Sequence, residues 1–172
     1  MSAPPANLLV AVANGVAWVK ILGRANFTSS VDFKRLVCEL QQRGYHRFVL
    51  DLSECVLMDS TFLGVLAGLG LKISQTPPSE ERHIELLNPN PRITDLLVNL
   101  GVAHLFKIIN SSSQANNRFG TQYVALSPSR EEISRTSLEA HRTLMEINPA
   151  NVPKFKDVTE FLAESLKKKD AP

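Results

Sequence analysis

Apolar and polar residues alternate along the chain in blocks that predict strands at its start and helices between later strands. Two mainly apolar runs, residues 8–13 and 16–22, are joined by Asn14-Gly15, a dipeptide that readily adopts the positive φ angles of a type I′ turn. Further short β-type runs are residues 48–52, 84–87 and 105–109. The sequence therefore predicts an opening β-hairpin followed by three single strands.

Apolar residues at helical spacing separate these later strands. Stripes with the spacing i, i+3, i+4 and i+7 are formed by Phe33, Leu36, Val37 and Leu40, and by Ile93, Leu96, Leu97 and Leu100. The first helix should begin at Ser29 or Ser30 and stop at Gly44, and the other should have Asn90-Pro91 as its N-cap and first residue. The order ββαβαβαβ indicates an α/β fold: a mixed β-sheet with helices packed on it.

Between these two helices lies the most apolar segment of the chain. Residues 62–71 contain no charged side chain, which predicts a helix covered on nearly every side. Gly64 and Gly68 share one face of it, and each of its three glycines costs roughly 1 kcal/mol relative to alanine. We expect a close approach to the sheet to compensate for this cost.

The C-terminal third has a different pattern. Residues 111–117 are polar and typical of a linker, and Ser129 with Glu132 matches a helix capping box. Two thin apolar stripes follow, formed by Leu138, His141, Leu144 and Met145, and by Phe155, Val158, Phe161, Leu162 and Leu166. They predict a helical hairpin that docks on the domain, on a second copy or on a partner, because two helices alone bury little apolar surface.

Composition and charge exclude several classes of protein. The 172 residues are 44% hydrophobic and 21% charged, which favours a folded domain over a disordered chain. The net charge is +2, divided evenly about Asn110, so we expect no nucleic-acid partner, and Lys167-Lys168-Lys169 is interpreted as a solvated helix end. No apolar run is long enough for a bilayer and the first residues lack a secretory pattern, so we expect no membrane association and a cytoplasmic protein.

Motifs for catalysis, metal ions and cofactors are scarce. Cys38 and Cys55 form no CxxC pair, and the sequence contains neither a glycine-rich phosphate loop nor the elbow motif of serine hydrolases. The histidines have no metal-ligand spacing and are interpreted as surface or hydrogen-bonded side chains; they are His46, His83, His104 and His141. We therefore expect no enzyme activity, no metal and no cofactor.

Asp59-Ser60-Thr61 is a polar triplet directly before the apolar helix, where an Asp or Ser side chain caps free N–H groups. A phosphate on a serine there would add about −1.5 to −2 charges at the positive end of the helix dipole. Asp59 would repel that phosphate, so the modification should change the surface potential sharply without unfolding the domain. Capping and phosphorylation are compatible functions for this triplet.

The triplet lies within VLDLSECVLMDSTFLGV, residues 49–65, which resembles the characteristic motif of bacterial anti-sigma factor antagonists, the STAS domain family. The hairpin ending at Gly23, the Asn88-Pro89 turn and residues 105–108 also follow the order of that family. The resemblance implies a STAS domain at residues 6–110, which leaves a linker at 111–128 and a helical extension at 129–169.

The resemblance also implies a function. In that family the serine after the aspartate is phosphorylated by an anti-sigma factor that is also a serine kinase, and a PP2C-type phosphatase reverses the modification. The corresponding residue here is Ser60, with Thr61 as a second candidate. The implied partner-binding surface comprises Asp59, Ser60 and Thr61 together with Arg24, Asn26, Thr28 and Ser29. The chain departs from the family pattern at Phe62, where glycine is common, and at Asn26, where an acidic residue is usual.

Three alternatives remain open at this point. The chain could be a STAS scaffold or ligand-binding module that phosphorylation does not control, as in stress-signalling or transport assemblies. It could form a homodimer through its C-terminal helices. It could also be an enzyme with Ser60 as nucleophile, although no general base is recognisable beside that serine in the sequence.

Overall fold

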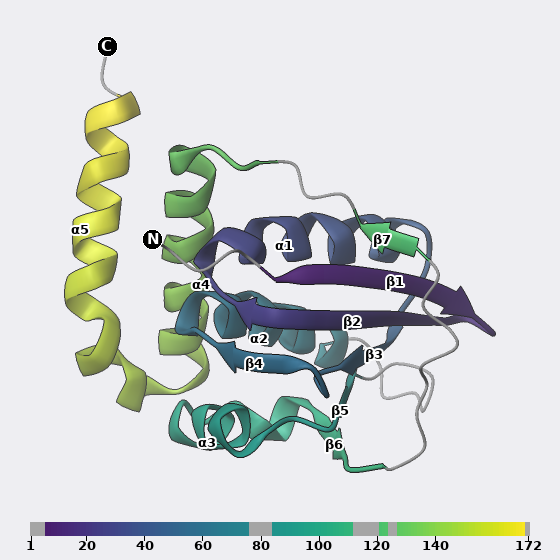
Figure 1. Ribbon diagram of the computed structural model, residues 1–172. Helices are drawn as coiled ribbons and strands as arrows, with labels where there is room; N and C mark the ends of the chain where they lie inside the picture. The colour runs from purple at the N-terminus through teal and green to yellow at the C-terminus, as the bar shows by residue number, and fades with distance from the viewer. Residues whose placement is uncertain (1–5, 76–83, 112–120, 124–126, 171–172) are drawn as a thin grey trace.

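The computed structural model describes residues 6–75, 84–111, 121–123 and 127–170 (Figure 1). Its first two strands, β1 (Asn7–Ala13) and β2 (Val16–Ala25), form the predicted antiparallel hairpin. Asn14 and Gly15 between them have φ angles of 53° and 77°. Positive φ at both positions is what a type I′ turn requires, so the local sequence determines this connection.

The described strands form one mixed sheet. The later strands are β3 (Arg47–Asp51), β4 (Cys55–Met58), β5 (Ile84–Leu87), β6 (Lys107–Ile109) and β7 (Thr121–Tyr123). Their order is β6-β5-β3-β2-β1-β7, with β4 paired to the end of β2. The pairs β2–β3, β3–β5 and β5–β6 are parallel, while β1 is antiparallel to both its neighbours.

This arrangement confirms the predicted mixed sheet and adds two strands to it. Strands β4 and β7, of four and three residues, were not among the predicted elements. Strand β7 lies within the segment interpreted as a linker and pairs with β1, so at least part of that segment continues the sheet.

Two helices, α1 (Phe27–Gln42) and α2 (Ser60–Ser74), lie on one face of the sheet (Figure 1). The rings of Phe33 and Phe62 stack between them at a centroid distance of 4.7 Å. The third helix, α3 (Pro91–Asn99), begins as predicted with the Asn90 side chain accepting from Ile93 N. The core lies between these helices and the sheet, and α2 is buried along most of its length as its composition predicted.

The predicted C-terminal hairpin is present and docks on the domain. Helix α4 (Arg130–Ile147) packs against α1 and α2, and α5 (Val152–Asp170) packs against the outer side of α4 (Figure 1). Asn151 in the short connection is fully buried, and its Nδ2 donates to the carbonyls of Leu100 and Leu144, 2.9 Å from each. The bond to Leu100 ties the turn of the hairpin to the end of α3, and the bond to Leu144 ties it to the last turn of α4.

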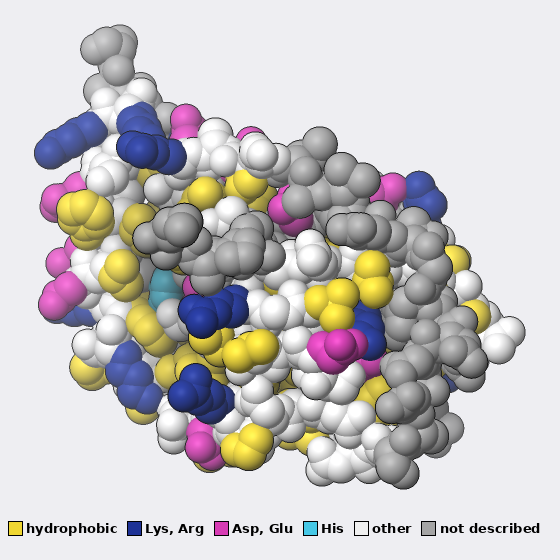
Figure 2. Space-filling model, in the orientation of Figure 1, with side chains coloured by type: hydrophobic (Ala, Val, Ile, Leu, Met, Phe, Trp, Pro, Cys, Tyr) yellow, Lys and Arg dark blue, Asp and Glu magenta, His cyan; other side chains and the backbone are white. Residues whose placement is uncertain are grey.

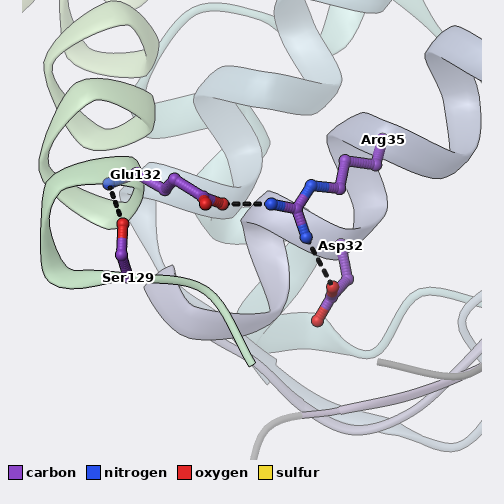
Figure 3. A network of polar contacts seen from close by, with 4 residues as sticks. All are labelled: Asp32, Arg35, Ser129 and Glu132. Carbon is purple, nitrogen blue, oxygen red and sulfur yellow. Dashed lines mark hydrogen bonds and ion pairs between the residues drawn. The ribbon is translucent and has the colours of Figure 1, made fainter. Parts of the chain in front are cut away.

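Ion pairs join the first half of α4 to α1. Figure 3 shows Arg35 of α1 between Glu132 of α4 and Asp32 on its own helix. Ser129 Oγ accepts from Glu132 N as a helix cap should, but the Glu132 carboxylate pairs with Arg35. The expected capping box is therefore only half formed, because the second half of that motif is used for a tertiary contact. Lys34 and Glu139 form another pair between the same helices.

The apolar stripe of α5 is only partly covered. Leu166 is 6% exposed, whereas Val158 and Phe161 are 39% and 67% exposed. Figure 2 shows hydrophobic side chains on this side of the molecule, interspersed with charged side chains of both signs. Within the described ranges, no helix combines the length and the apolar composition that crossing a membrane requires.

Candidate functional site

The polar triplet begins helix α2, as the sequence predicts. Asp59 has extended backbone angles (φ −93°, ψ 172°), and its Oδ1 accepts from Phe62 N at 2.9 Å. Its own amide donates to Ala25 O at 2.9 Å. Asp59 is thus the N-cap of α2 and is also fixed to the end of β2. Ser60, the first residue of the helix, is half-buried beside it.

The start of α1 differs from the expected position. The helix begins at Phe27, with Asn26 as its N-cap: Asn26 Oδ1 accepts from Ser29 N at 3.1 Å, and Asn26 N donates to Ser29 Oγ at 3.0 Å. The expectation of a start at Ser29 or Ser30 is wrong because Asn26 and Ser29 cap one turn earlier. Ser29 is therefore 1% exposed and its hydroxyl serves the cap.

Strand pairing brings this segment next to the triplet. Arg24 and Ala25 of β2 are aligned with Leu57 and Met58 of β4, so the loop before α1 and the start of α2 leave the sheet together. From the end of β2 to the first turn of α1, Arg24 is exposed, Phe27 is 50% exposed, and Asn26 and Thr28 are partly buried. The predicted site residues therefore lie in one region, although Ser29 and Thr61 are too buried to offer much contact area.

Helix α4 covers the triplet. Ser60 Oγ lies 2.8 Å from His141 Nε2, and Thr61 Oγ1 lies 3.1 Å from Ser137 Oγ. Thr61 and His141 are each 5% exposed. The surface that the sequence analysis assigned to an external partner is thus partly occupied by the chain's own C-terminal helix.

The hydrogen bonds of His141 define its tautomer. Nδ1 lies 2.7 Å from the carbonyl oxygen of Ser137, which can only accept, so Nδ1 carries the hydrogen. In the neutral ring Nε2 is then an acceptor, and the Ser60 hydroxyl donates to it. The ring of Phe155 from α5 lies against the imidazole at a centroid distance of 4.7 Å.

Burial shifts the pKa of both ionisable groups at this contact. It lowers the pKa of His141 below its ordinary value, although the bond to Ser137 and the charge of Asp59 act in the opposite direction. Burial also raises the pKa of Asp59, against hydrogen bonds from the amides of Phe62 and Phe27 and the nearby His141. The neutral imidazole is therefore the form that suits the docked helix.

His141 is the residue that the sequence analysis overlooked at this site. The absence of a base beside Ser60 was inferred from local motifs, but 81 residues separate the two side chains in the sequence. The available indication was a histidine within the apolar stripe of a predicted amphipathic helix. Its interpretation as a hydrogen-bonded histidine holds, but its partner could not be inferred.

Two glycines of α2, Gly64 and Gly68, face α4. A Cβ at Gly64 would lie 2.5 Å from Ala140 O and 2.6 Å from Ala140 Cβ, so the two helix backbones touch there. At Gly68 the nearest atom, Thr143 Cγ2, would be 3.8 Å away. The expected close approach exists, but at Gly64 it is to α4 rather than to the sheet.

The remaining space near the site is small. A groove of about 180 Å³ lies between α1, α2 and α4, with Lys34, Gly68 and Thr143 in its lining. Pockets for small molecules commonly measure roughly 300 to 1,000 Å³. In the described part of the chain, no cluster of three or more His, Cys, Asp or Glu side chains could hold a metal ion.

Comparisons with known proteins agree with this architecture. The family model of the STAS domain matches residues 7–115 of this chain. A comparison with curated protein sequences gives no match. The family match ends before α4, so neither α4 nor α5 belongs to the matched region.

Solved structures with this fold include three from anti-sigma factor antagonists. One is a Thermotoga maritima protein described as an anti-sigma factor antagonist, with a TM-score of 0.55 and 22% identity over 65% of this chain and 93% of that chain. SpoIIAA in its unphosphorylated form has a TM-score of 0.50 and 13% identity, over 61% of this chain and 89% of its own. Bacillus SpoIIAA in its phosphorylated form has a TM-score of 0.50 and 14% identity, over 62% and 92%. At these identities the likeness concerns the fold.

Proposed function

Because this chain belongs to the STAS domain family, we propose that it is a non-catalytic binding module of the anti-sigma factor antagonist type. Its partner is an anti-sigma factor that is also a serine kinase, and a phosphate on Ser60 ends the binding. A PP2C-type phosphatase restores the binding form. Residues 6–110 are the binding unit, and the helices beyond them are an extension of it.

The observation that carries this proposal is the position of Ser60. Its hydroxyl stands at the first turn of α2, between the N-cap Asp59 and the loop before α1, where strand pairing joins the predicted contact segments into one region. Added charge at that point changes the surface most sharply, since the helix dipole and the Asp59 carboxylate both act there. Any partner that binds there must first displace α4 from Ser60.

The contacts around Ser60 also favour binding over catalysis. His141 accepts a hydrogen bond from the Ser60 hydroxyl, as a general base would, but the Phe62 amide at the helix start already donates to Asp59. A serine nucleophile needs such amides free to stabilise the oxyanion of its intermediate. The Ser60–His141 pair is therefore assigned to docking of α4.

The test has two parts. Trypsin cleavage after Arg47 and Lys72 yields the peptide 48–72, and mass spectrometry of protein from its native host should find phosphate on Ser60 within it. Titration calorimetry against the anti-sigma kinases of the same host should then show one that binds the wild type and Ser60→Ala but not Ser60→Asp. Ser74→Asp, on an exposed serine at the far end of α2, is the matched control and should bind.

A scaffold function without phosphorylation is the second candidate, favoured by the hydrogen bond that engages Ser60 with His141. Peptide 48–72 without phosphate under every growth condition, together with equal binding by Ser60→Asp and wild type, would establish this alternative and refute the switch.

A further inference from the structure

The extension does more than lengthen the chain, because α4 occupies the surface assigned to the partner. It contributes a hydrogen-bonding group to each of the two candidate phosphoacceptors: His141 to Ser60 and Ser137 to Thr61. It also lies against the Gly64 backbone one turn further along α2. The same residues of α2 cannot bind α4 and an external partner at once.

A phosphate on Ser60 disrupts the contact of that residue with docked α4. The hydroxyl oxygen is 2.8 Å from His141 Nε2, and the phosphate replaces the hydrogen that it donates there with a phosphorus atom and three further oxygens. The neutral imidazole presents an acceptor to those oxygens, and in the described part of the chain Ser60 forms no hydrogen bond with Lys or Arg. Asp59 places a carboxylate beside the same point, so a phosphate held between α2 and α4 would be repelled and poorly solvated.

The hairpin is retained by Leu144, which is fully buried in the main core, and by the hydrogen bond from Asn151 to Leu100 O, but its other contacts with α1 and α2 are weaker. The ion pairs Arg35–Glu132 and Lys34–Glu139 have partners that are 35% to 62% exposed, so each stabilises docking weakly. The closest helix contact involves Gly64 and Ala140, two residues with little apolar surface to bury. The groove between α1, α2 and α4 lies beside this contact and leaves part of the interface unfilled.

We propose that docked α4 and a phosphate on Ser60 exclude each other, so that phosphorylation releases the α4–α5 hairpin from the domain. The hairpin is thereby an internal competitor for the partner surface in the unmodified protein. In the phosphorylated protein it becomes a free helical element. The inference rests on the proposed function for the origin of the phosphate.

The test requires no kinase. Phosphoserine is installed at position 60 of the full chain during synthesis, through a reassigned stop codon, and hydrogen exchange is followed by mass spectrometry. The amides of residues 130–147 should exchange about a hundredfold faster or more than in the unmodified protein, as expected when a charge is left unpaired in an interface. Peptides from β3 and from the second half of α2 should keep their protection.

Two controls separate the phosphate from lesser changes. Ser60→Ala removes only the hydrogen bond to His141 and should raise the exchange of α4 by less than phosphoserine does, because it leaves one neutral acceptor without a donor rather than adding a charge. Phosphoserine at position 74, which is exposed on the same helix, should leave α4 protected. Unchanged protection of residues 130–147 with phosphoserine at position 60 would overturn the inference, because α4 would then accommodate the phosphate. That outcome differs from a failure of the proposed function, which would appear as missing phosphate in the native host.

Discussion

The contact between α2 and α4 can be tested with a single methyl group at Gly64. An alanine Cβ there would lie 2.5 Å from the carbonyl oxygen and 2.6 Å from the Cβ of Ala140. Non-bonded carbon atoms prefer separations of about 3.5 to 4.0 Å, so α4 would have to move away by about 1 Å. The nearest atoms belong to α4, and three of them lie within 2.7 Å, so Gly64→Ala should weaken docking of α4 rather than the domain core.

The magnitude follows from two opposing terms. Replacing glycine by alanine inside a helix stabilises it by up to about 1 kcal/mol, whereas forcing an extra methyl group into a packed interface costs about 1 to 3 kcal/mol. Gly68→Ala is the matched control, since its Cβ would be 3.8 Å from Thr143 Cγ2, an ordinary contact. Gly68→Ala should thus gain the helix term alone, and the two variants should differ by about 1 to 3 kcal/mol.

Hydrogen exchange of residues 130–147 measures this difference directly. Relative to Gly68→Ala, α4 in Gly64→Ala should exchange roughly ten- to a hundredfold faster, at about 1.4 kcal/mol for each factor of ten. Denaturant unfolding of both variants gives the global free energy of unfolding, with which the exchange of α4 can be compared. If Gly64→Ala proves as stable and as protected as Gly68→Ala, α4 does not lie against α2 and the reasoning about its docking is wrong.

Two further predictions concern the same hairpin. Because the pKa of His141 is lowered in the docked state, docking is unaffected above the ordinary histidine pKa of about 6.5 and weakens as the pH falls below it, by up to about 1.4 kcal/mol per pH unit. The raised pKa of Asp59 gives docking a pH dependence of the opposite sign. The measurement is therefore the difference in α4 exchange between wild type and His141→Gln as the pH is lowered. An equal pH dependence in both proteins would refute the assignment of this effect to His141. Asn151→Ala should destabilise the protein by about 1 to 3 kcal/mol in denaturant unfolding, because it removes two buried hydrogen bonds, to the carbonyls of Leu100 and Leu144. A loss below 0.5 kcal/mol, about the smallest value for a buried hydrogen bond, would show that water replaces Asn151 there.

Much of the fold was predictable because short-range chemistry determines it. Asn14-Gly15 requires a tight turn, Asn90-Pro91 begins a helix, and Asp59 caps the next residues along the chain. Each of these features depends on groups within about four residues of one another. Helical spacing likewise predicted the buried side of α1, α3 and α4, whereas Val158 and Phe161 of the stripe predicted for α5 are exposed.

Two predictions failed where two local patterns competed. Two serines suggested a later start of α1, but Asn26 caps it with Ser29 as its partner. Glu132 fits a capping box by spacing, yet its carboxylate binds Arg35, 97 residues earlier. In both cases the residue type is one that is common at helix ends, but the group with which its side chain forms a hydrogen bond depends on the surrounding structure.

The sequence by itself determined a mixed sheet, a buried helix with a capped start, and a polar triplet at that start. Only the tertiary structure decided that α4 covers the triplet, with His141 on Ser60 and Ala140 against Gly64. The glycine pattern predicted a close approach but not the identity of the neighbour. The physical reason is that the spacing of a side chain along the sequence specifies its helix face. Its partner depends on the path of the chain between Ser60 and His141, which are 81 positions apart.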